Sequence, residues 1–271
     1  MRLEPALVGR TFESVEIRDP RLTRPFEPVE VAAELEGARV DSVGRRGKYV
    51  IVGFENGAVL LVHLRMTGSL IHAPSGAAAD DPHLRAVVRL DDGSDVVYRD
   101  VRRFGTWLVL DGEQLAEYFA GRLGEEPLEA DFTTATLRDR LGKRRAPLKA
   151  ALLDQRTLAG MGNIYVDEAL WRARLHPLRP AGTLEPRELR ALHRAVRAAL
   201  ELGIKRQGAT LRDYRAPDGS SGRMQQEFRV YGRAGEPCER CGTPIEKIRA
   251  GGRGTWYCPA CQRAEGAART T

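Results

Sequence analysis

The sequence predicts an α+β protein built from an N-terminal β-sandwich, a helical domain and a C-terminal four-cysteine zinc finger. Three observations support this prediction. Short β-branched segments separated by turns fill residues 11–110, helical periodicity begins near Thr133, and the only four cysteines form two Cys-x-x-Cys pairs near the end of the chain. The predicted boundaries are residues 1–122 for the sandwich, 123–225 for the helical domain and 226–263 for the finger, with a tail at 264–271.

The sandwich prediction depends on two hairpin signals. One pair of apolar segments flanks Glu55-Asn56-Gly57, and another flanks Asp91-Asp92-Gly93, and both turns are typical of tight hairpins. A short helix at Pro28–Glu36 is expected to cross the sandwich. The predicted strands are Lys48–Phe54, Ala58–Leu64, Arg85–Leu90, Asp95–Arg99 and Thr106–Leu110.

Helical signals follow the strands. Apolar side chains recur every three or four residues between about Leu184 and Leu202, which predicts a long helix with Thr183 as its N-cap and Gly203 as its end. We expect a linker at Leu123–Pro127. The loop Arg212–Gly222 has no periodicity and is expected to be flexible. Shorter helices are predicted at Gln114–Arg122, Thr134–Leu141, Leu148–Gln155 and Gly162–Ala173.

The cysteine pairs Cys238/Cys241 and Cys258/Cys261 predict one structural Zn²⁺ site. Sixteen residues separate the pairs, and each pair can turn two thiolates toward one point. The segment is too short and polar to build its own core, so metal binding would supply its folding free energy. Two disulfides or an iron–sulfur cluster are the alternatives. Disulfides need an oxidising compartment, for which the sequence carries no signal.

Composition favours a polyanionic partner inside the cell. The 271 residues include 43 Lys and Arg against 37 Asp and Glu, which gives a net charge of +6 and a pI of about 9.3. The longest apolar stretch, near Ala58–Val62, is too short for a membrane span, and the first residues do not resemble a signal peptide. We therefore expect an intracellular protein with reduced thiols.

Several short motifs could contact a nucleic acid. Arg45-Arg46-Gly47-Lys48 is a cationic run before a strand, and a solvated charge run is its plainer interpretation. His63–Gly68 places Met66 in a turn, where a core methionine is the alternative. Asp100–Gly105 combines Arg102 with Phe104, which is the composition of a wedge that enters a duplex, although a structural turn explains it equally well.

Downstream motifs suit phosphate binding. Leu158–Asn163 contains two glycines before a helix, where backbone N–H groups could face a phosphate or Asn163 could simply cap the helix. Lys143-Arg144-Arg145 and Lys149 lie shortly upstream. Between the cysteine pairs, Arg249–Thr255 is a basic, glycine-rich hairpin tip, which is typical of a probe into a groove.

Together these motifs resemble the formamidopyrimidine-DNA glycosylase family of base-excision repair. The resemblance runs from about Leu3 to Arg263 and implies a β-sandwich, a helix-two-turns-helix domain and a zinc finger. The segments that carry it are Arg45–Tyr49, His63–Gly68, Asp100–Gly105, Leu123–Leu128, Gly160–Leu170, Val230–Arg233 and the four cysteines.

The resemblance implies a role for each matching residue. Met66, Arg102 and Phe104 would fill the gap left by a flipped base. Lys48 and Arg253 would be catalytic, with Lys48 assisting β-elimination and Arg253 the second elimination. The loop around Arg215–Met224 would cover the extruded base, which favours oxidised guanine over the oxidised pyrimidines of the endonuclease VIII type. The residues implied to contact DNA are His83, Arg102, Arg144, Lys149, Asn163 and Tyr231.

The implied protein is a bifunctional glycosylase and abasic-site lyase that binds one Zn²⁺. It would act as a cytoplasmic, nucleoid-associated monomer on double-stranded DNA with oxidised purines or abasic sites. A non-catalytic module that binds damaged DNA is the alternative. A zinc-ribbon adaptor for proteins is disfavoured, because the basic residues and the aromatic wedge would then have no task.

The start of the chain departs from the family pattern. The family begins with a proline, which becomes the N-terminal amine, followed by a glutamate, whereas Leu3–Arg10 here matches the end of the family's first helix. Pro5 is internal, so its nitrogen is an amide, and Glu4 aligns with a helix position. We expect that the family's opening segment is absent because the chain starts at an internal codon; a genuinely shortened, non-catalytic protein is the alternative. Without that amine, the chain should lack glycosylase activity by this route.

Overall fold

The computed structural model describes residues 3–211 and 214–264, which form two compact units. One unit contains the residues up to Ala120 together with Gln207–Arg223, and the other contains Gly121–Arg206 and the residues from Met224 onward. The loop 207–223, which the sequence boundaries assign to the second domain, therefore clusters with the sandwich. Arg212 and all but the first residue of the predicted tail lie outside the described residues.

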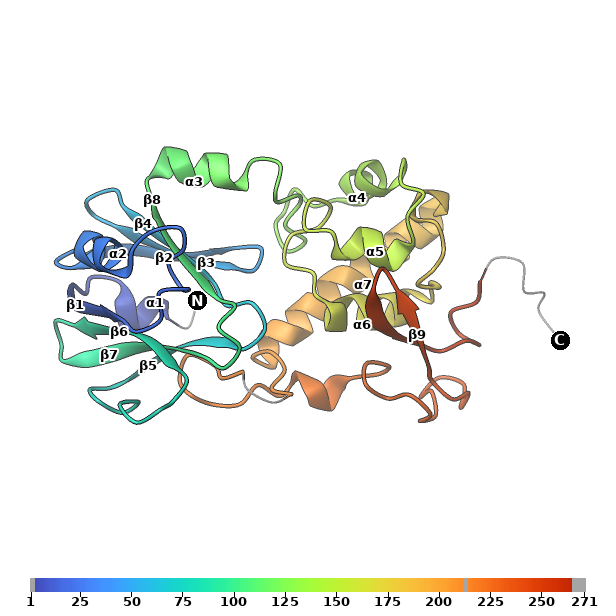
Figure 1. Ribbon diagram of the computed structural model, residues 1–271. Helices are drawn as coiled ribbons and strands as arrows, with labels where there is room; N and C mark the ends of the chain where they lie inside the picture. Colours follow the sequence, from blue (N-terminus) through green and yellow to red (C-terminus); the bar gives the residue numbers. More distant parts are fainter. Residues whose placement is uncertain (1–2, 212–213, 265–271) are drawn as a thin grey trace. The chain divides into compact units, whose positions relative to one another are not determined.

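The first unit is a sandwich of two antiparallel four-stranded sheets (Figure 1). Buried side chains from both sheets form one core, with Leu35, Val62 and Tyr98 among its fully buried members. The first sheet contains, in order, β1 (Phe12–Ile17), β6 (Leu84–Leu90), β7 (Ser94–Asp100) and β5 (Gly68–Pro74). The second contains β2 (Val40–Arg46), β3 (Tyr49–Phe54), β4 (Val59–His63) and β8 (Thr106–Leu110).

The strand predictions are confirmed to within one or two residues, and β1, β2 and β5 complete the region. The two hairpin turns join β3 to β4 and β6 to β7, as their sequences indicate. Burial alternates along β6, whose even-numbered residues face the core. Within the described part of this unit there are three helices: α1 (Glu4–Leu7), α2 (Pro28–Leu35) and α3 (Gly112–Phe119).

The second unit combines a helical core with a small finger that has its own apolar cluster. Its long helix packs its buried stripe against the preceding helices, as the periodicity predicts. The helices are α4 (Thr134–Leu141), α5 (Leu148–Leu153), α6 (Asn163–Ala173) and α7 (Pro186–Lys205), with short 3-10 turns at Ala181–Thr183 and Met224–Glu227. The finger hairpin pairs β9 (Glu246–Ala250) with β10 (Arg253–Tyr257).

Both predicted ends of the long helix were wrong. Glu185 rather than Thr183 is the N-cap, because Glu185 and Glu188 form a reciprocal capping box around Pro186. Gly203 does not end the helix. It is buried within α7, and a Cβ at this position would lie 2.4 Å from the Tyr165 ring, so the glycine makes room for a close contact.

The predicted linker Leu123–Pro127 is an ordered part of the second unit. Glu125 forms a parallel bridge with Leu158, and the N–H of Gly124 donates to the carbonyl of Gln155 at 2.8 Å. A Cβ on Gly124 would lie 2.2 Å from the Arg156 carbonyl oxygen, which explains the glycine. The segment therefore anchors the loop that leads to α6.

Candidate nucleic-acid interface

The three predicted wedge residues lie together on the surface of the sandwich unit. Met66 follows β4 in one turn, and Phe104 follows β7 in another. Their large apolar side chains are 64% and 51% exposed. The Arg102 guanidinium bridges them, since its Nη1 lies 2.9 Å from the Met66 sulfur and its centre lies 4.7 Å from the centroid of the Phe104 ring. The structure thus brings residues from two separate turns into one exposed apolar and cationic cluster, called the wedge below.

A buried carboxylate, Asp100, holds the wedge in place. Its Oδ1 accepts hydrogen bonds from the Thr67 hydroxyl and from the N–H of Arg102 at 3.2 Å. Its Oδ2 accepts from the N–H groups of Phe104 and Gly105 at 2.9 and 2.8 Å. Asp100 is almost fully buried, so these bonds fix both turns without competition from water.

Two glycines make this arrangement possible. A Cβ on Gly68 would lie 2.5 Å from the Tyr98 hydroxyl oxygen, and a Cβ on Gly105 would lie 1.6 Å from the same atom. Tyr98 is a fully buried core residue that packs edge-on against Trp107. The glycines of both motifs therefore let the wedge turns close over the core.

Further charged groups surround the wedge turns. Arg103 has a left-handed backbone with φ of 60°, and its guanidinium binds the Asp19 carboxylate, with Nη2 2.8 Å from Oδ1. This hydrogen bond holds the pKa of Asp19 below its ordinary value. His83 is half-buried, and its carbonyl accepts the N–H of Asp100 at 3.0 Å. Arg103 thus serves as a tether, whereas the Arg102 side chain reaches the surface.

Lys48 lies in the turn between β2 and β3, where it is exposed. Its charge acts on the buried His63 imidazole of β4. Burial, Arg65 and Lys48 together lower the pKa of His63 to about 4. The neutral ring accepts the Arg65 N–H on Nδ1 at 2.9 Å. The structure therefore places Lys48 close to the strand that leads into the Met66 turn.

The loop predicted to cover an extruded base is attached to the sandwich. The N–H of Arg215 donates to the Ser69 hydroxyl at 3.1 Å, and the N–H of His72 donates to the Pro217 carbonyl at 2.9 Å. An open surface pocket of about 390 Å³ is lined by Ala6, His72, Pro217 and Asp218. The loop is thus tethered on β5 and contributes two residues to the wall of this pocket.

In the second unit, Lys149 does not lie where its predicted role requires. Its side chain has no exposed surface, its Nζ lies 2.7 Å from Oδ1 of the equally buried Asp167, and it donates to the Gly254 carbonyl at 2.9 Å. The prediction that Lys149 touches a phosphate is therefore corrected, because the side chain has no surface to offer. Asn163 Nδ2 donates to the same carbonyl at 3.1 Å.

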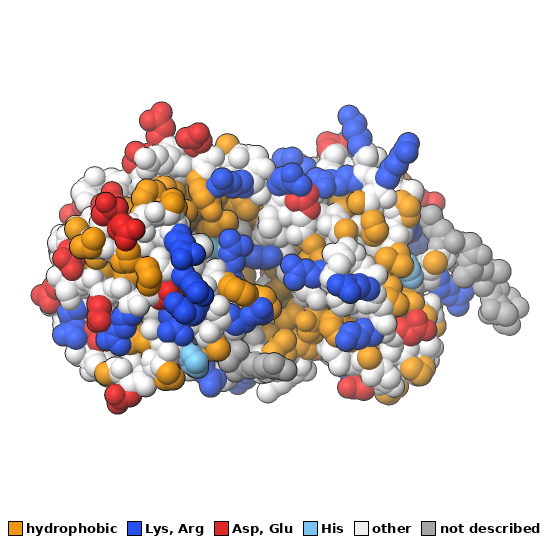
Figure 2. Space-filling view, in the orientation of Figure 1, with side chains coloured by type: hydrophobic (Ala, Val, Ile, Leu, Met, Phe, Trp, Pro, Cys, Tyr) orange, Lys and Arg blue, Asp and Glu red, His pale blue; other side chains and the backbone are white. Residues whose placement is uncertain are grey.

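The remaining predicted contacts are at least partly exposed. Arg253 is exposed at the start of β10, after a turn formed by two left-handed glycines. Arg144 is half-buried, and its Nη1 binds Asp154 Oδ2 at 2.9 Å. Tyr231 packs its ring against Phe228 and Trp256. Figure 2 shows lysine and arginine side chains on the visible face of each unit.

Sequence reasoning missed two adjacent carboxylates on α6, Asp167 and Glu168. Both are buried, and burial raises the pKa of Asp167 to about 6 and also raises the pKa of Glu168. Asp167 Oδ2 accepts the N–H of Trp256 at 3.1 Å. Glu168 Oε1 accepts the N–H groups of Arg229, Val230 and Tyr231 at 2.9, 3.0 and 3.1 Å. Charged residues within an otherwise apolar helix face were the available signal.

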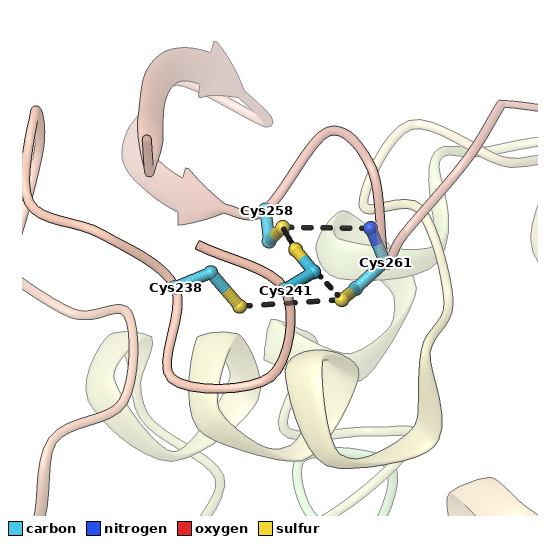
Figure 3. A group of neighbouring side chains, drawn as sticks. All are labelled: Cys238, Cys241, Cys258 and Cys261. Atoms are coloured by element: carbon cyan, nitrogen blue, oxygen red, sulfur yellow. Dashed lines mark hydrogen bonds between the residues drawn. The ribbon is translucent and has the colours of Figure 1, made fainter. Parts of the chain in front are cut away.

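The four cysteines form a cluster that fits a zinc ion. Their sulfur atoms all lie within 4.8 Å of one another and point inward from the two Cys-x-x-Cys loops (Figure 3). The sulfurs of Cys241 and Cys258 lie 3.5 Å apart, and those of Cys238 and Cys261 lie 4.0 Å apart. A tetrahedral Zn²⁺ with four thiolates needs separations of about 3.8 Å. The Trp171 indole N–H also points at the Cys238 sulfur at 3.5 Å.

Family models match most of the chain. The formamidopyrimidine-DNA glycosylase N-terminal domain matches residues 1–107, its H2TH domain matches residues 123–215, and the zinc finger found in FPG and IleRS matches residues 235–264. These matches confirm the predicted sandwich, helix-two-turns-helix domain and zinc finger. The first match begins at residue 1, and it lends no support to the expectation of a missing opening segment.

Full-length relatives agree with the family models. The formamidopyrimidine-DNA glycosylase of Chloroflexus aggregans is 46% identical over 96% of this chain and 94% of its own, and that of Bacillus subtilis is 44% identical over 94% and 92%. A Lactococcus lactis Fpg in complex with abasic-site DNA has a TM-score of 0.90 at 37% identity, covering 97% of this chain and 96% of its own. A MutM bound to DNA with carbocyclic 8-oxo-G has a TM-score of 0.89 at 37% identity, with the same coverage. Among the described residues, no helix has the length and hydropathy needed to cross a membrane.

Proposed function

The chain belongs to the formamidopyrimidine-DNA glycosylase family, and we propose that it recognises and excises oxidised purines, including 8-oxoguanine and formamidopyrimidines, from double-stranded DNA. The same site would process abasic sites. The observation that carries this proposal is the exposed wedge of Met66, Arg102 and Phe104 on a rigid, buried support. An exposed methionine and phenylalanine held by an arginine have no role in the core of this unit.

The wedge suits base flipping. A base extruded from a duplex leaves a gap, and apolar side chains that stack on the neighbouring bases lower the cost of that gap. Met66 and Phe104 supply the apolar surface, and Arg102 supplies a charge for the phosphates or for the unpaired opposite base. The tethered loop at Arg215–Met224 and the open pocket that it helps to line would receive the extruded base.

Phosphate contacts would come from both units. In the sandwich, Arg102 belongs to the wedge, and His83 lies beside the wedge turns. In the helical unit, Arg144, Asn163 and Arg253 are at least partly exposed. Tyr231 would contact DNA with the accessible part of its ring. Since these contacts are largely electrostatic, binding should weaken steeply with salt.

The reaction would follow the family's order of steps. An amine attacks the sugar C1′ as the base leaves, and the resulting iminium ion allows β-elimination of the 3′ phosphate and then δ-elimination of the 5′ phosphate. Lys48 would assist the first elimination and Arg253 the second. Pro5 cannot supply the amine, since its nitrogen lies in the backbone amide at the start of α1. Borohydride trapping followed by peptide mapping would identify the amine that does.

The test uses three duplexes that contain 8-oxoguanine opposite cytosine, an abasic site, or no damage. We expect tighter binding and cleavage of the two damaged duplexes, and a Phe104→Ala variant should bind them at least 10-fold more weakly. Phe26→Ala is the matched control, because Phe26 is a phenylalanine of the same unit that is 45% exposed and does not belong to the wedge. Equal affinity of the parent for all three duplexes would refute the proposal.

The same assay separates the alternatives. Specific binding without cleavage would identify a non-catalytic protein that binds damaged DNA. Preference for an oxidised pyrimidine would identify the endonuclease VIII type. We further propose that the protein acts as a monomer inside the cell, where its DNA substrate and reduced thiols are found.

A further inference from the structure

The buried ion pair between Lys149 and Asp167 has no part in the steps above. Lys149 comes from α5 and Asp167 from α6, their charged atoms lie 2.7 Å apart, and neither side chain is exposed. A buried ion pair gains little stability over apolar residues of similar size, because both charges lose their hydration. Stability of the helical core alone therefore does not explain why this pair is present.

Both members of the pair bind the finger hairpin. Lys149 Nζ donates to the Gly254 carbonyl at 2.9 Å, and Asp167 Oδ2 accepts the Trp256 N–H at 3.1 Å. Gly254 and Trp256 are alternate residues of β10, whose only partner strand is β9 among the described residues. Alternate residues direct their backbone groups to the same edge, so the ion pair supplies the donor and the acceptor that a further strand would supply.

Two further contacts hold the same end of the hairpin. Asn163 Nδ2 also donates to the Gly254 carbonyl, at 3.1 Å. At the turn, a Cβ on Gly251 would lie 3.0 Å from the Cβ of Ala150, so the hairpin tip packs closely on α5. Gly252 and Arg253 lie between these fixed points, and Arg253, which directly precedes Gly254, is exposed.

We propose that Asp167, acting through Lys149, is a positioning residue that sets the direction of Arg253 toward a DNA phosphate. The carboxylate orients the ammonium group, the ammonium group fixes the Gly254 carbonyl, and the fixed peptide limits the directions open to the Arg253 side chain. The inference rests on the proposed function, in which Arg253 touches a phosphate. In this proposal the two charges are present because they fix the position of Arg253, and not because they stabilise the fold.

The test measures binding to a duplex that contains a tetrahydrofuran abasic analogue, which cannot be cleaved. We expect Asp167→Asn to weaken binding about 10-fold and to lower the slope of log affinity against log salt by about 0.9, the value for one lost phosphate contact. Arg253→Ala should give the same changes. The double variant should be no weaker than Arg253→Ala alone, since the two residues act through one contact.

The controls separate position from folding. Asp139→Asn makes the same chemical change in an exposed ion pair of α4 and should leave binding unchanged. Because Asp167→Asn leaves Lys149 unpaired, the variant Lys149→Met/Asp167→Leu removes both charges and is expected to fold and retain zinc. That variant should still show the reduced salt slope, which does not depend on the fraction of protein that is folded.

The outcomes are distinct. If the parent binds the analogue no better than intact duplex, the proposed function itself fails. If the parent discriminates but Asp167→Asn keeps the full salt slope, or if its effect adds to that of Arg253→Ala, only the positioning role is overturned. Full affinity in the zinc-loaded Lys149→Met/Asp167→Leu variant would overturn it as well.

Discussion

In the sandwich unit a buried carboxylate, Asp100, holds the turns that carry the wedge, whereas in the helical unit Glu168 holds the chain that leads into the zinc finger. Asp100 uses both oxygens, and two of its donors, Phe104 and Gly105, lie within five residues. Glu168 takes three N–H groups mainly on one oxygen, from residues 61 to 63 positions away. The first carboxylate organises its own turn, and the second joins distant segments.

The largest expected effect tests how the two carboxylates use their oxygens. Asp100→Asn should lower the free energy of unfolding by about 4 kcal/mol. Both carboxylate oxygens accept hydrogen bonds, so the NH₂ group that replaces one of them leaves buried donors without an acceptor. Glu168→Gln should cost about 1 kcal/mol, since the amide oxygen can replace Oε1 and keep the three N–H groups. Urea unfolding measures both values. Equal losses of stability in the two variants would show that the different use of the oxygens by Asp100 and Glu168 has no energetic consequence.

The same contrast explains what sequence could predict. The composition of the Met66 and Phe104 turns suggested a wedge but left a structural turn as an equal alternative, and the family resemblance then implied the wedge; the residues that shape these turns lie within short motifs. The roles of Lys149 and Glu168 were not predicted, because the backbone groups that they bind lie about 60 to 105 residues away and no local pattern marks the pairing. Five of the sandwich strands and the longer helices were predictable from periodicity, which is also a local property, whereas β1, β2 and β5 were not predicted.

Helix ends show where local rules fail. Thr183 was predicted as the N-cap of the long helix because threonine suits that position, but its hydroxyl donates to the Pro180 carbonyl at 2.9 Å and the helix begins later. Gly203 was predicted as the end because glycine usually stops a helix. Tertiary packing against Tyr165 gives this glycine a different purpose, and no single-sequence signal reveals it.

The next largest effect is a loss of stability at low pH, and it concerns His63, a titratable side chain of the sandwich unit. The folded pKa of His63 is about 4, against an ordinary value of 6.5, so the unfolded chain binds a proton first as pH falls. The stability from neutral His63 is therefore complete above pH 6.5 and declines between pH 6.5 and 4, by about 3 kcal/mol at pH 4. His63→Asn, whose Oδ1 can accept the Arg65 N–H, should remove that part of the decline. Urea unfolding at pH 7, 5.5 and 4 measures it, and parallel pH profiles of parent and variant would contradict this assignment.

The smallest effect compares one helical glycine from each unit. Gly203→Ala should destabilise the protein by about 1–2 kcal/mol, because the added Cβ would lie 2.4 to 2.7 Å from atoms of the Tyr165 ring and the ring must move. Gly112→Ala in α3 should stabilise it by about 0.5 kcal/mol, since a Cβ there meets no atom within 4 Å and alanine favours the helix. The two substitutions are chemically identical. Changes of opposite sign in the melting temperature would therefore separate the effect of the Tyr165 contact from that of helix propensity. Stabilisation by both would mean that the ring moves aside at little cost, and that Gly203 is not required for the packing of α6 on α7.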